Sequence, residues 1–177
     1  MIKKILIIIT VLILVMVINE VYEGFQRQKD RQKIFKQAQA RSYQLNKPLL
    51  VYGDPYYGIG SRFFNTFMDG YGCGDETVDL TGCPNCPNGK KSDMLAHLKT
   101  KESNSQIIFI SCVLEYLDDI DQVINEIIRV AGSLDNVFVV TVGEKSLSAY
   151  FYSEDDYKAK NLVKAPPKFT ELTYIKI

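Results

Sequence analysis

The clearest pattern of apolar and polar positions in the chain runs from Ser105 to Gly132. Ile107 to Cys112 is a short, almost continuously apolar run with several β-branched residues, which is typical of a parallel strand buried on both faces. We expect Asp118 or Asp119 to cap a helix that follows this strand, and Gly132 to end it. The i, i+3, i+4, i+7 spacing predicts the apolar face of this helix, namely Ile120, Val123, Ile124, Ile127, Ile128 and Ala131.

Asn136 to Val142 then predicts a second buried strand. Together with the preceding strand and helix it forms a β-α-β unit, which almost always has a right-handed crossover. The domain is therefore expected to belong to the α/β class.

Pro48 to Asp54 predicts the first strand of the domain, and the turn behind it contains Gly58 and Gly60. A short helix with Ser61 as its cap is expected next. Three aromatic residues of this helix should face the sheet: Phe63, Phe64 and Phe67.

The remaining elements are shorter. Glu76 to Leu80 predicts a second strand, Lys91 to Met94 a very short third one, and residues 94–100 about two turns of helix. Residues 146–157 have a helix-like start, and residues 172–177 are a plausible strand that could pair antiparallel with the sheet.

The amino-terminal region contains an apolar run from Ile5 to Ile18 that only Thr10 interrupts. The run is short for a full membrane span of about 20 residues, but Val21 and Tyr22 can extend it at the interface. An uncleaved membrane anchor is the preferred interpretation, because the residues after the run offer no small-x-small cleavage site. A cleaved signal peptide and a buried helix are the alternatives.

Flanking charge predicts the orientation of this span. Only Lys3 and Lys4 precede it, and the side with more positive charge normally stays in the cytoplasm. We therefore expect a single-pass protein with a cytoplasmic domain. Five basic residues follow the span closely: Arg27, Lys29, Arg31, Lys33 and Lys36.

Glu20 to Asn46 is rich in Gln, Lys, Arg and Ala and predicts a stem helix that ends near Pro48. Two interpretations of this stem are open. It is either a basic arm that lies against anionic lipid headgroups or a solvated spacer.

Composition fits one domain with an attachment. The chain has 177 residues, of which 46% are apolar, so a sizeable core is possible. We assign residues 1–19 to the anchor, 20–46 to the stem and 47–177 to the domain. A formal net charge of zero gives no field that would attract nucleic acid. The four cysteines lack a framework of paired spacings, which favours reduced thiols or a metal over disulfides.

The stretch from Val113 to Val130 resembles the fourth strand and following helix of class I S-adenosylmethionine-dependent methyltransferases of the small-molecule type. In that family the strand runs into V-L-E-H, an acidic turn, and a helix that ends in R-V. Here the corresponding positions hold Cys112, Val113, Leu114, Glu115, Tyr116, Asp118, Asp119, Arg129 and Val130. Upstream, LLVYGDPYYGIG resembles the first strand and cofactor loop, VDL the second strand with its ribose-binding acid, and SDM the acid near the adenine.

This resemblance implies a three-layer, Rossmann-like sheet that is mostly parallel. With the elements predicted above, the expected fold adds an antiparallel C-terminal strand and one preceding transmembrane helix. The resemblance implies S-adenosylmethionine as the cofactor. Glu115 and Tyr116 would then lie beside the cofactor pocket as catalytic candidates. The cofactor-binding candidates are Gly53, Asp54, Gly58, Gly60, Asp79, Asp93 and Cys112.

The chain also departs from the family pattern. Val51 replaces the usual acid before the glycine loop, Pro55 replaces a glycine, and Tyr116 replaces the histidine. Judged by residue type alone, Glu115 can pair locally, the aspartates and glycines suit ordinary turns, and Cys112 suits a core thiol.

The cysteine loop allows a separate interpretation. Cys83 and Cys86 have the spacing of a zinc knuckle, which Cys73 and His97 could complete. A redox pair and a plain structural turn are the other possibilities. The structural turn is favoured, so zinc is not expected.

Three functions follow from these patterns. The leading hypothesis is a membrane-anchored methyltransferase that acts on a small or membrane-associated acceptor. The alternative is a non-catalytic protein of the same fold at a membrane surface, such as one of a large DNA virus. The third is a small zinc-stabilised α/β domain. The expected partners are a membrane and a small-molecule cofactor, without nucleic acid, and the sequence identifies no protein partner.

Overall fold

The computed structural model describes residues 2–68, 72–114, 117 and 120–140. Its centre is a five-stranded sheet with the strand order β3-β2-β1-β4-β5, and all four strand pairs are parallel. This is the order of a doubly wound α/β sheet, which reverses direction between β1 and β4. The strands are β1 Leu49–Tyr52, β2 Glu76–Asp79, β3 Gly89–Lys91, β4 Ile107–Ser111 and β5 Val137–Val140.

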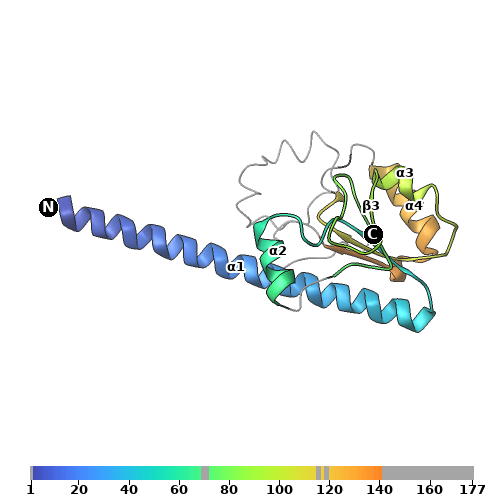
Figure 1. The fold of residues 1–177 in the computed structure, drawn as a ribbon, viewed down its shortest axis with the longest axis horizontal. Helices are drawn as coiled ribbons and strands as arrows, with labels where there is room; N and C mark the ends of the chain where they lie inside the picture. Colours follow the sequence, from blue (N-terminus) through green and yellow to red (C-terminus); the bar gives the residue numbers. More distant parts are fainter. Residues whose placement is uncertain (1, 69–71, 115–116, 118–119, 141–177) are drawn as a thin grey trace.

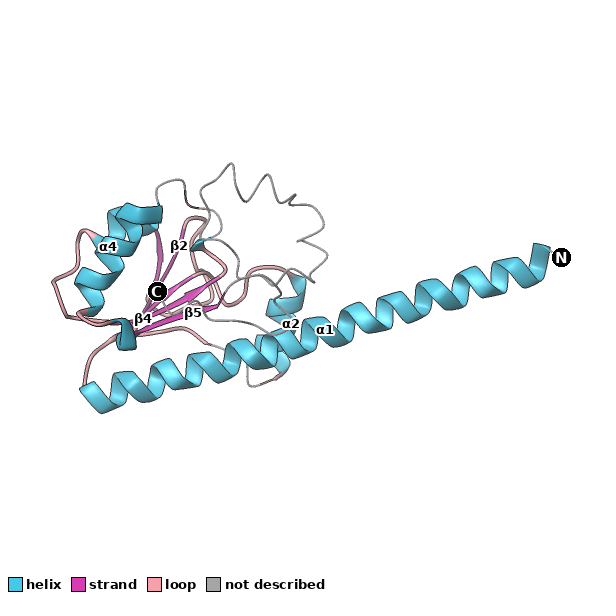
Figure 2. Ribbon diagram, turned by 180° about the vertical axis from the view of Figure 1, so that it is seen from behind, coloured by secondary structure: helices cyan, strands magenta, loops and turns pink. Residues whose placement is uncertain are grey.

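Helices cover both faces of this sheet (Figure 2). On one face the core contains Leu50, Tyr52, Ile108 and Ile110, and α3 and α4 pack over them. On the other face the second half of α1 packs over Leu49, Val51, Ile107 and Phe109. The helices are α1 Ile2–Leu45, α2 Ile59–Phe67, α3 Met94–Leu98 and α4 Ile120–Ala131, with a 3-10 turn at Leu134–Asn136.

The β-α-β unit of β4, α4 and β5 is confirmed. All five residues of β4 are buried, as expected for a central strand with helices on both faces. On α4 the buried residues include Val123 and Ile127, whereas Ile128 of the predicted apolar face is exposed. The two proposed caps, Asp118 and Asp119, lie outside the described residues.

Gly132 ends α4 as predicted. Its φ of +73° lies in the left-handed region, and its N–H donates to the carbonyl of Ile128 over 2.8 Å. A Cβ at this position would come within 2.0 Å of the Asn104 side chain, so glycine is required by space as well as by conformation.

The third strand lies two residues earlier than predicted, at Gly89–Lys91. The shift has a local cause, because Asp93 is the cap of α3 and accepts a hydrogen bond from the backbone N–H of Ala96 at 2.9 Å. Asp93 therefore belongs to the start of a helix and not to a strand. The predicted antiparallel strand lies outside the described residues.

The interpretation of residues 20–46 as an arm or a spacer is wrong for the second half of this segment. A single unbroken helix runs from Ile2 to Leu45, about 66 Å long at 1.5 Å per residue (Figure 1). Ile34, Phe35 and Ala38 are buried against the sheet, and the ring of Phe35 meets that of Phe109 edge to face at 5.3 Å. These apolar residues stand among basic and amide residues in the sequence, so the pattern did not indicate an apolar face.

The first part of α1 differs from the second. Its large apolar side chains from Leu6 to Ile18 are exposed, and the helix is long and apolar enough to cross a membrane. A signal sequence would have the same length and composition.

The predictions for α2 are confirmed only in part. Of the three aromatic residues expected to face inward, Phe64 is buried, whereas Phe63 and Phe67 are exposed. The cause is a short helix that packs through one edge, since Phe64 meets Phe25 of α1 with ring centroids 5.5 Å apart. Ser61 is not the cap. The helix begins at Ile59 after Gly58.

We expect Phe35→Ala to lower the free energy of unfolding by about 3–5 kcal/mol, because it removes a buried aromatic side chain from the joint between α1 and the sheet. Chemical denaturation of the full chain in detergent measures this change. The exposed neighbour Gln37→Ala is the control and should change the stability by no more than about 0.5 kcal/mol. Equal effects of the two substitutions would contradict the packing role of α1.

Candidate functional site

The carboxyl ends of β1 and β4 mark the point at which the sheet changes direction, where α/β proteins usually bind ligands. Gly53 follows β1 with a φ of +100°, and its N–H donates to the carbonyl of Val78 over 2.9 Å. A Cβ at Gly53 would lie 2.5 Å from the carbonyl oxygen of Ser111. The turns after β1 and β4 are therefore in direct contact, and only glycine fits between them.

Asp54 and Asp79, two of the predicted cofactor-binding residues, meet at this edge. Asp79 Oδ2 accepts from the backbone N–H of Asp54 at 3.2 Å, and Oδ1 accepts from the N–H and hydroxyl of Thr81 at 2.8 and 2.7 Å. Asp54 Oδ1 accepts from the N–H of Tyr56 at 2.9 Å. Burial raises the pKa of Asp54 against the effect of that hydrogen bond, and the charge of Asp79 adds to the rise. Both carboxylates thus shape their turns while they keep spare acceptor positions.

Cys83 lies buried near these acids. Burial, with the negative charges of Asp54 and Asp79, raises the pKa of the Cys83 thiol to about 12. The side chain therefore stays a neutral thiol at physiological pH, which makes it a poor nucleophile and a poor metal ligand.

The other predicted cofactor residues have different positions. Gly58 has a φ of +78° and precedes α2, whereas Gly60 lies inside the helix. A Cβ at either glycine would meet nothing within 4 Å, so the space around both is open. Asp93 uses Oδ1 to cap α3. Glu115 and Tyr116, the catalytic candidates, lie outside the described residues.

Cys112 stands at the end of β4 with a φ of +53°, and its N–H donates to the carbonyl of Val140 over 2.7 Å. Its sulfur accepts a hydrogen bond from Arg31 Nη2 at 2.8 Å. Arg31 comes from α1 and was not among the predicted site residues, because its segment was assigned to a stem. Arg31 lies four positions before the buried Phe35, so the two side chains share one face of the helix. This spacing is the signal that could have placed Arg31 toward the sheet.

Three buried side-chain oxygens have no hydrogen-bond partner among the described residues: Gln28 Oε1, Asn65 Oδ1 and Ser111 Oγ. They come from α1, α2 and β4. The amide nitrogens are used, since Gln28 donates to Ser61 and Asn65 donates to the carbonyl of Pro55. Buried polar atoms normally have partners, so each of these oxygens can bind a water or a polar ligand group.

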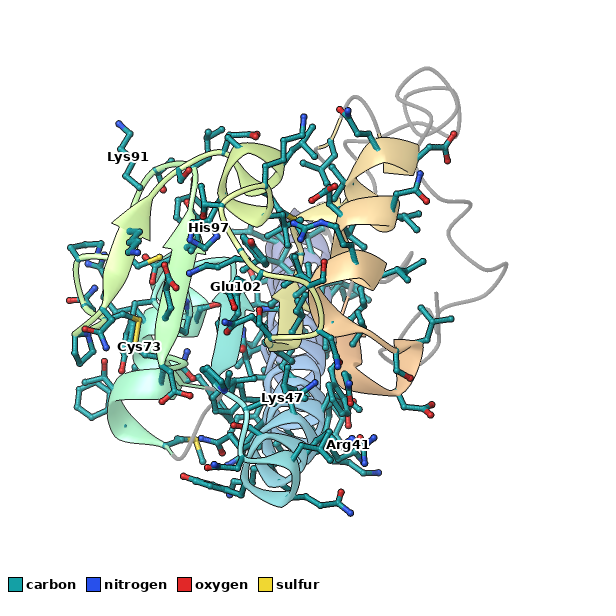
Figure 3. All side chains as sticks on the ribbon, turned by 90° about the vertical axis from the view of Figure 1, so that its right-hand side faces the viewer. Arg41, Lys47, Cys73, Lys91, His97 and Glu102 are labelled. Atoms are coloured by element: carbon teal, nitrogen blue, oxygen red, sulfur yellow. A yellow bond between two sulfur atoms is a disulfide. The ribbon has the colours of Figure 1, made fainter. Side chains whose placement is uncertain are left out.

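The cysteines are not all reduced, which corrects the expectation from their spacing. Cys73 and Cys86 form a disulfide with Cα atoms 5.5 Å apart, and it joins the segment before β2 to the loop before β3. Figure 3 shows this bond beside the label of Cys73. A redox pair of Cys83 with Cys86 is therefore wrong. The alternative zinc site is wrong in its proposed form too, because the disulfide uses the sulfurs of Cys73 and Cys86, two of its four ligands.

His97 is a buried structural link and not a metal ligand. Its Nδ1 is 2.8 Å from the hydroxyl of Tyr52, and its Nε2 is 2.8 Å from Glu76 Oε1. Lys90 and Lys101 also contact the carboxylate of Glu76. The network links α3 to the first three strands. Figure 3 labels His97, the residue of α3 at the centre of this network.

Two groups in this network have a pKa below the ordinary value. Burial opposes ionisation of Glu76, but hydrogen bonds from Lys101, Lys90 and His97 lower its pKa to about 2. Burial lowers the pKa of His97, and the contact with Glu76 offsets part of that effect. At neutral pH the site therefore contains a carboxylate and a neutral imidazole.

Comparisons of the chain with protein-family models, with curated proteins and with solved structures give no match. The resemblance to class I methyltransferases therefore stays a prediction that rests on the residues described above.

We expect the imidazole of His97 to titrate below its ordinary value of 6.5, because burial disfavours the charged form. Because the pKa of His97 is lower in the folded than in the unfolded state, its contribution to folding stability is fully present above pH 6.5. This contribution is lost as the pH falls through the folded-state pKa. Glu76→Gln should lower the pKa of His97 further, since it removes the charge that raises it. NMR titration measures both values without ambiguity, because the chain has one histidine.

Glu102→Gln is the control for this titration, as Glu102 is an exposed acid in the loop after α3. It should leave the pKa of His97 unchanged. An upward shift in Glu76→Gln would contradict the network.

Reduction of the Cys73–Cys86 disulfide should lower the free energy of unfolding by about 3 kcal/mol, since it releases a loop with a sequence separation of 13. Denaturation with and without a phosphine reductant measures the change. In the Cys73→Ser/Cys86→Ser double variant the reductant should have no effect.

The redox state of the same disulfide in cells indicates whether the domain lies in an oxidising or a reducing compartment, because structural disulfides persist mainly in oxidising environments. In cells whose free thiols are trapped with a maleimide at lysis, two further cysteines should react only after reduction. Reaction of all four cysteines before reduction would place the domain in a reducing compartment.

Proposed function

We propose that this chain is a membrane-anchored domain that binds S-adenosylmethionine at the carboxyl edge of its sheet and transfers the methyl group to a small or membrane-associated acceptor. The observation that carries the proposal is the meeting of Gly53, Asp54 and Asp79 at the point where the strand order reverses. The resemblance of the sequence around Val113 to Val130 supports it.

The residues at this edge have suitable chemistry for such a cofactor. Asp79 ends β2 and has spare acceptor positions for ribose hydroxyls. The buried atoms Ser111 Oγ, Gln28 Oε1 and Asn65 Oδ1 can accept from the amino groups of a ligand. The cofactor would supply a methyl group on a sulfonium. The protein's share of such a reaction is mainly to orient the reactants and exclude water.

A second candidate function is a non-catalytic domain that acts as a structural or interaction module at a membrane surface. A specific observation favours it, because the carboxylates of Asp54, Asp79 and Asp93 already bind backbone groups of the protein. In this case the acids would serve only to hold the turns, and the edge would need no ligand.

Both candidates include anchoring through α1, and the disulfide changes the proposed side of the membrane. The expectation of a cytoplasmic domain rested on flanking charge and on reduced cysteines. The Cys73–Cys86 bond removes the second argument and favours an oxidising compartment. We infer that the domain faces that compartment, which the thiol-trapping experiment above tests.

Calorimetric titration of the full chain in detergent with S-adenosylmethionine, or with its demethylated product, separates the two candidates. We expect saturable binding that weakens at least about tenfold in Asp79→Ala, which corresponds to about 1.4 kcal/mol. Asp121→Ala, on the exposed side of α4, is the control and should bind like the unaltered chain.

Unfolding curves of each variant confirm that it is folded before titration. A folded, unaltered chain that binds neither compound would contradict the cofactor proposal and leave the non-catalytic function. Equal binding by the Asp79→Ala and Asp121→Ala variants would contradict the role given to Asp79.

A further inference from the structure

Helix α2 has an exposed aromatic surface. Phe63 is 61% and Phe67 73% exposed, and their rings are 5.1 Å apart because residues four positions apart share one face of a helix. Tyr57 before the helix and Met68 after it are exposed as well. Grouped apolar side chains at a surface are typical of an interaction site.

The position of α2 indicates what this surface meets. Figures 1 and 2 show α2 lying across α1 at the end of the domain nearest to the apolar amino-terminal part of that helix. Two contacts fix it there. Phe64 packs on Phe25, and Gln28 Nε2 donates to Ser61 Oγ over 3.1 Å.

The distance along α1 is short. Phe25 is seven positions after Ile18, the end of the apolar run, which is about 10 Å of helix. The headgroup region on each side of a bilayer is about 5–8 Å thick. A helix with its side chains is about 10–12 Å wide, so α2 must touch the headgroups when α1 crosses the membrane.

The length of the apolar run also affects the distance between α2 and the bilayer. Ile5 to Ile18 spans about 21 Å of helix, less than the roughly 30 Å of a bilayer core. The bilayer must therefore thin, or residues up to Tyr22 must enter it. Thinning leaves α2 about 10 Å from the end of the bilayer core, and entry of residues up to Tyr22 moves α2 closer to it.

We propose that α2 is a second membrane contact, in which Phe63 and Phe67 enter the interface of the bilayer that α1 crosses. This rests on the proposed anchoring by α1. Exposed Arg62 on α2, and Lys29, whose Nζ lies 4.7 Å from the ring centre of Phe25, add positive charge that suits anionic headgroups. The turn after β1 leads directly into α2, so the carboxyl edge of the sheet faces the lipid surface.

The chain has no tryptophan, so a single introduced tryptophan reports its own surroundings. The full chain is reconstituted in vesicles of phosphatidylcholine and phosphatidylserine, with bromine on the acyl chains of the phosphatidylcholine. Tryptophan in the Phe67→Trp variant should emit at shorter wavelength than in water and be quenched most by bromine near the headgroups. Phe63→Trp should behave alike.

Two matched variants make the result decisive. Leu14→Trp lies in the apolar run and should be quenched by bromine at depth, which tests the anchoring itself. Tyr43→Trp replaces a residue that is 82% exposed and about 38 Å of helix beyond Ile18, so it should not be quenched.

Quenching at Leu14→Trp without quenching at Phe63→Trp or Phe67→Trp would overturn the second contact and leave the anchor intact. No quenching at any of these positions would overturn the anchoring instead. Tryptophan at position 67 that is shielded from aqueous acrylamide and untouched by bromine would show that protein covers α2, which also overturns the proposal.

Discussion

The packing of one face of α1 on the sheet is the contact on which the rest of this structure depends. Ile34, Phe35 and Ala38 cover β1, β4 and β5, and the same helix continues without interruption into the apolar run. The apolar run and part of the domain core therefore belong to one helix. Arg31 and Gln28 reach the carboxyl edge of the sheet only because this packing fixes the rotation of α1.

The elements predicted best were those whose sequence pattern has a single physical cause. The buried run of β4 and the apolar face of α4 must cover a core, and both were recognised. Asp54 and Asp79 were predicted as candidates at the ends of strands, and the parallel sheet brings these two ends to one edge. The role of α1 in the core was missed, because Ile34 and Phe35 stand among charged residues. Arg31 was missed with it.

Long-range pairing explains the other failures. The spacing of Cys83 and Cys86 suggested a local site, whereas the partner of Cys86 is Cys73, on the far side of β2. His97 was a candidate zinc ligand, yet Tyr52 and Glu76 bind its two ring nitrogens. The partners of Cys86 and His97 are brought to them by the folded arrangement of the strands. No local pattern in the sequence indicates these contacts.

The unbroken course of α1 also has a mechanical consequence. The described helix has no proline and no break between the apolar run and the sheet, so no loop separates the two. A tilt of its first part would therefore also tilt the domain. From Tyr22 to Ser42 the helix extends about 30 Å, and a tilt of about 20°, ordinary for a membrane helix, would carry its far end sideways by about 10 Å. In a chain anchored as proposed, membrane thickness, which influences that tilt, would therefore affect the direction in which the edge of the sheet points.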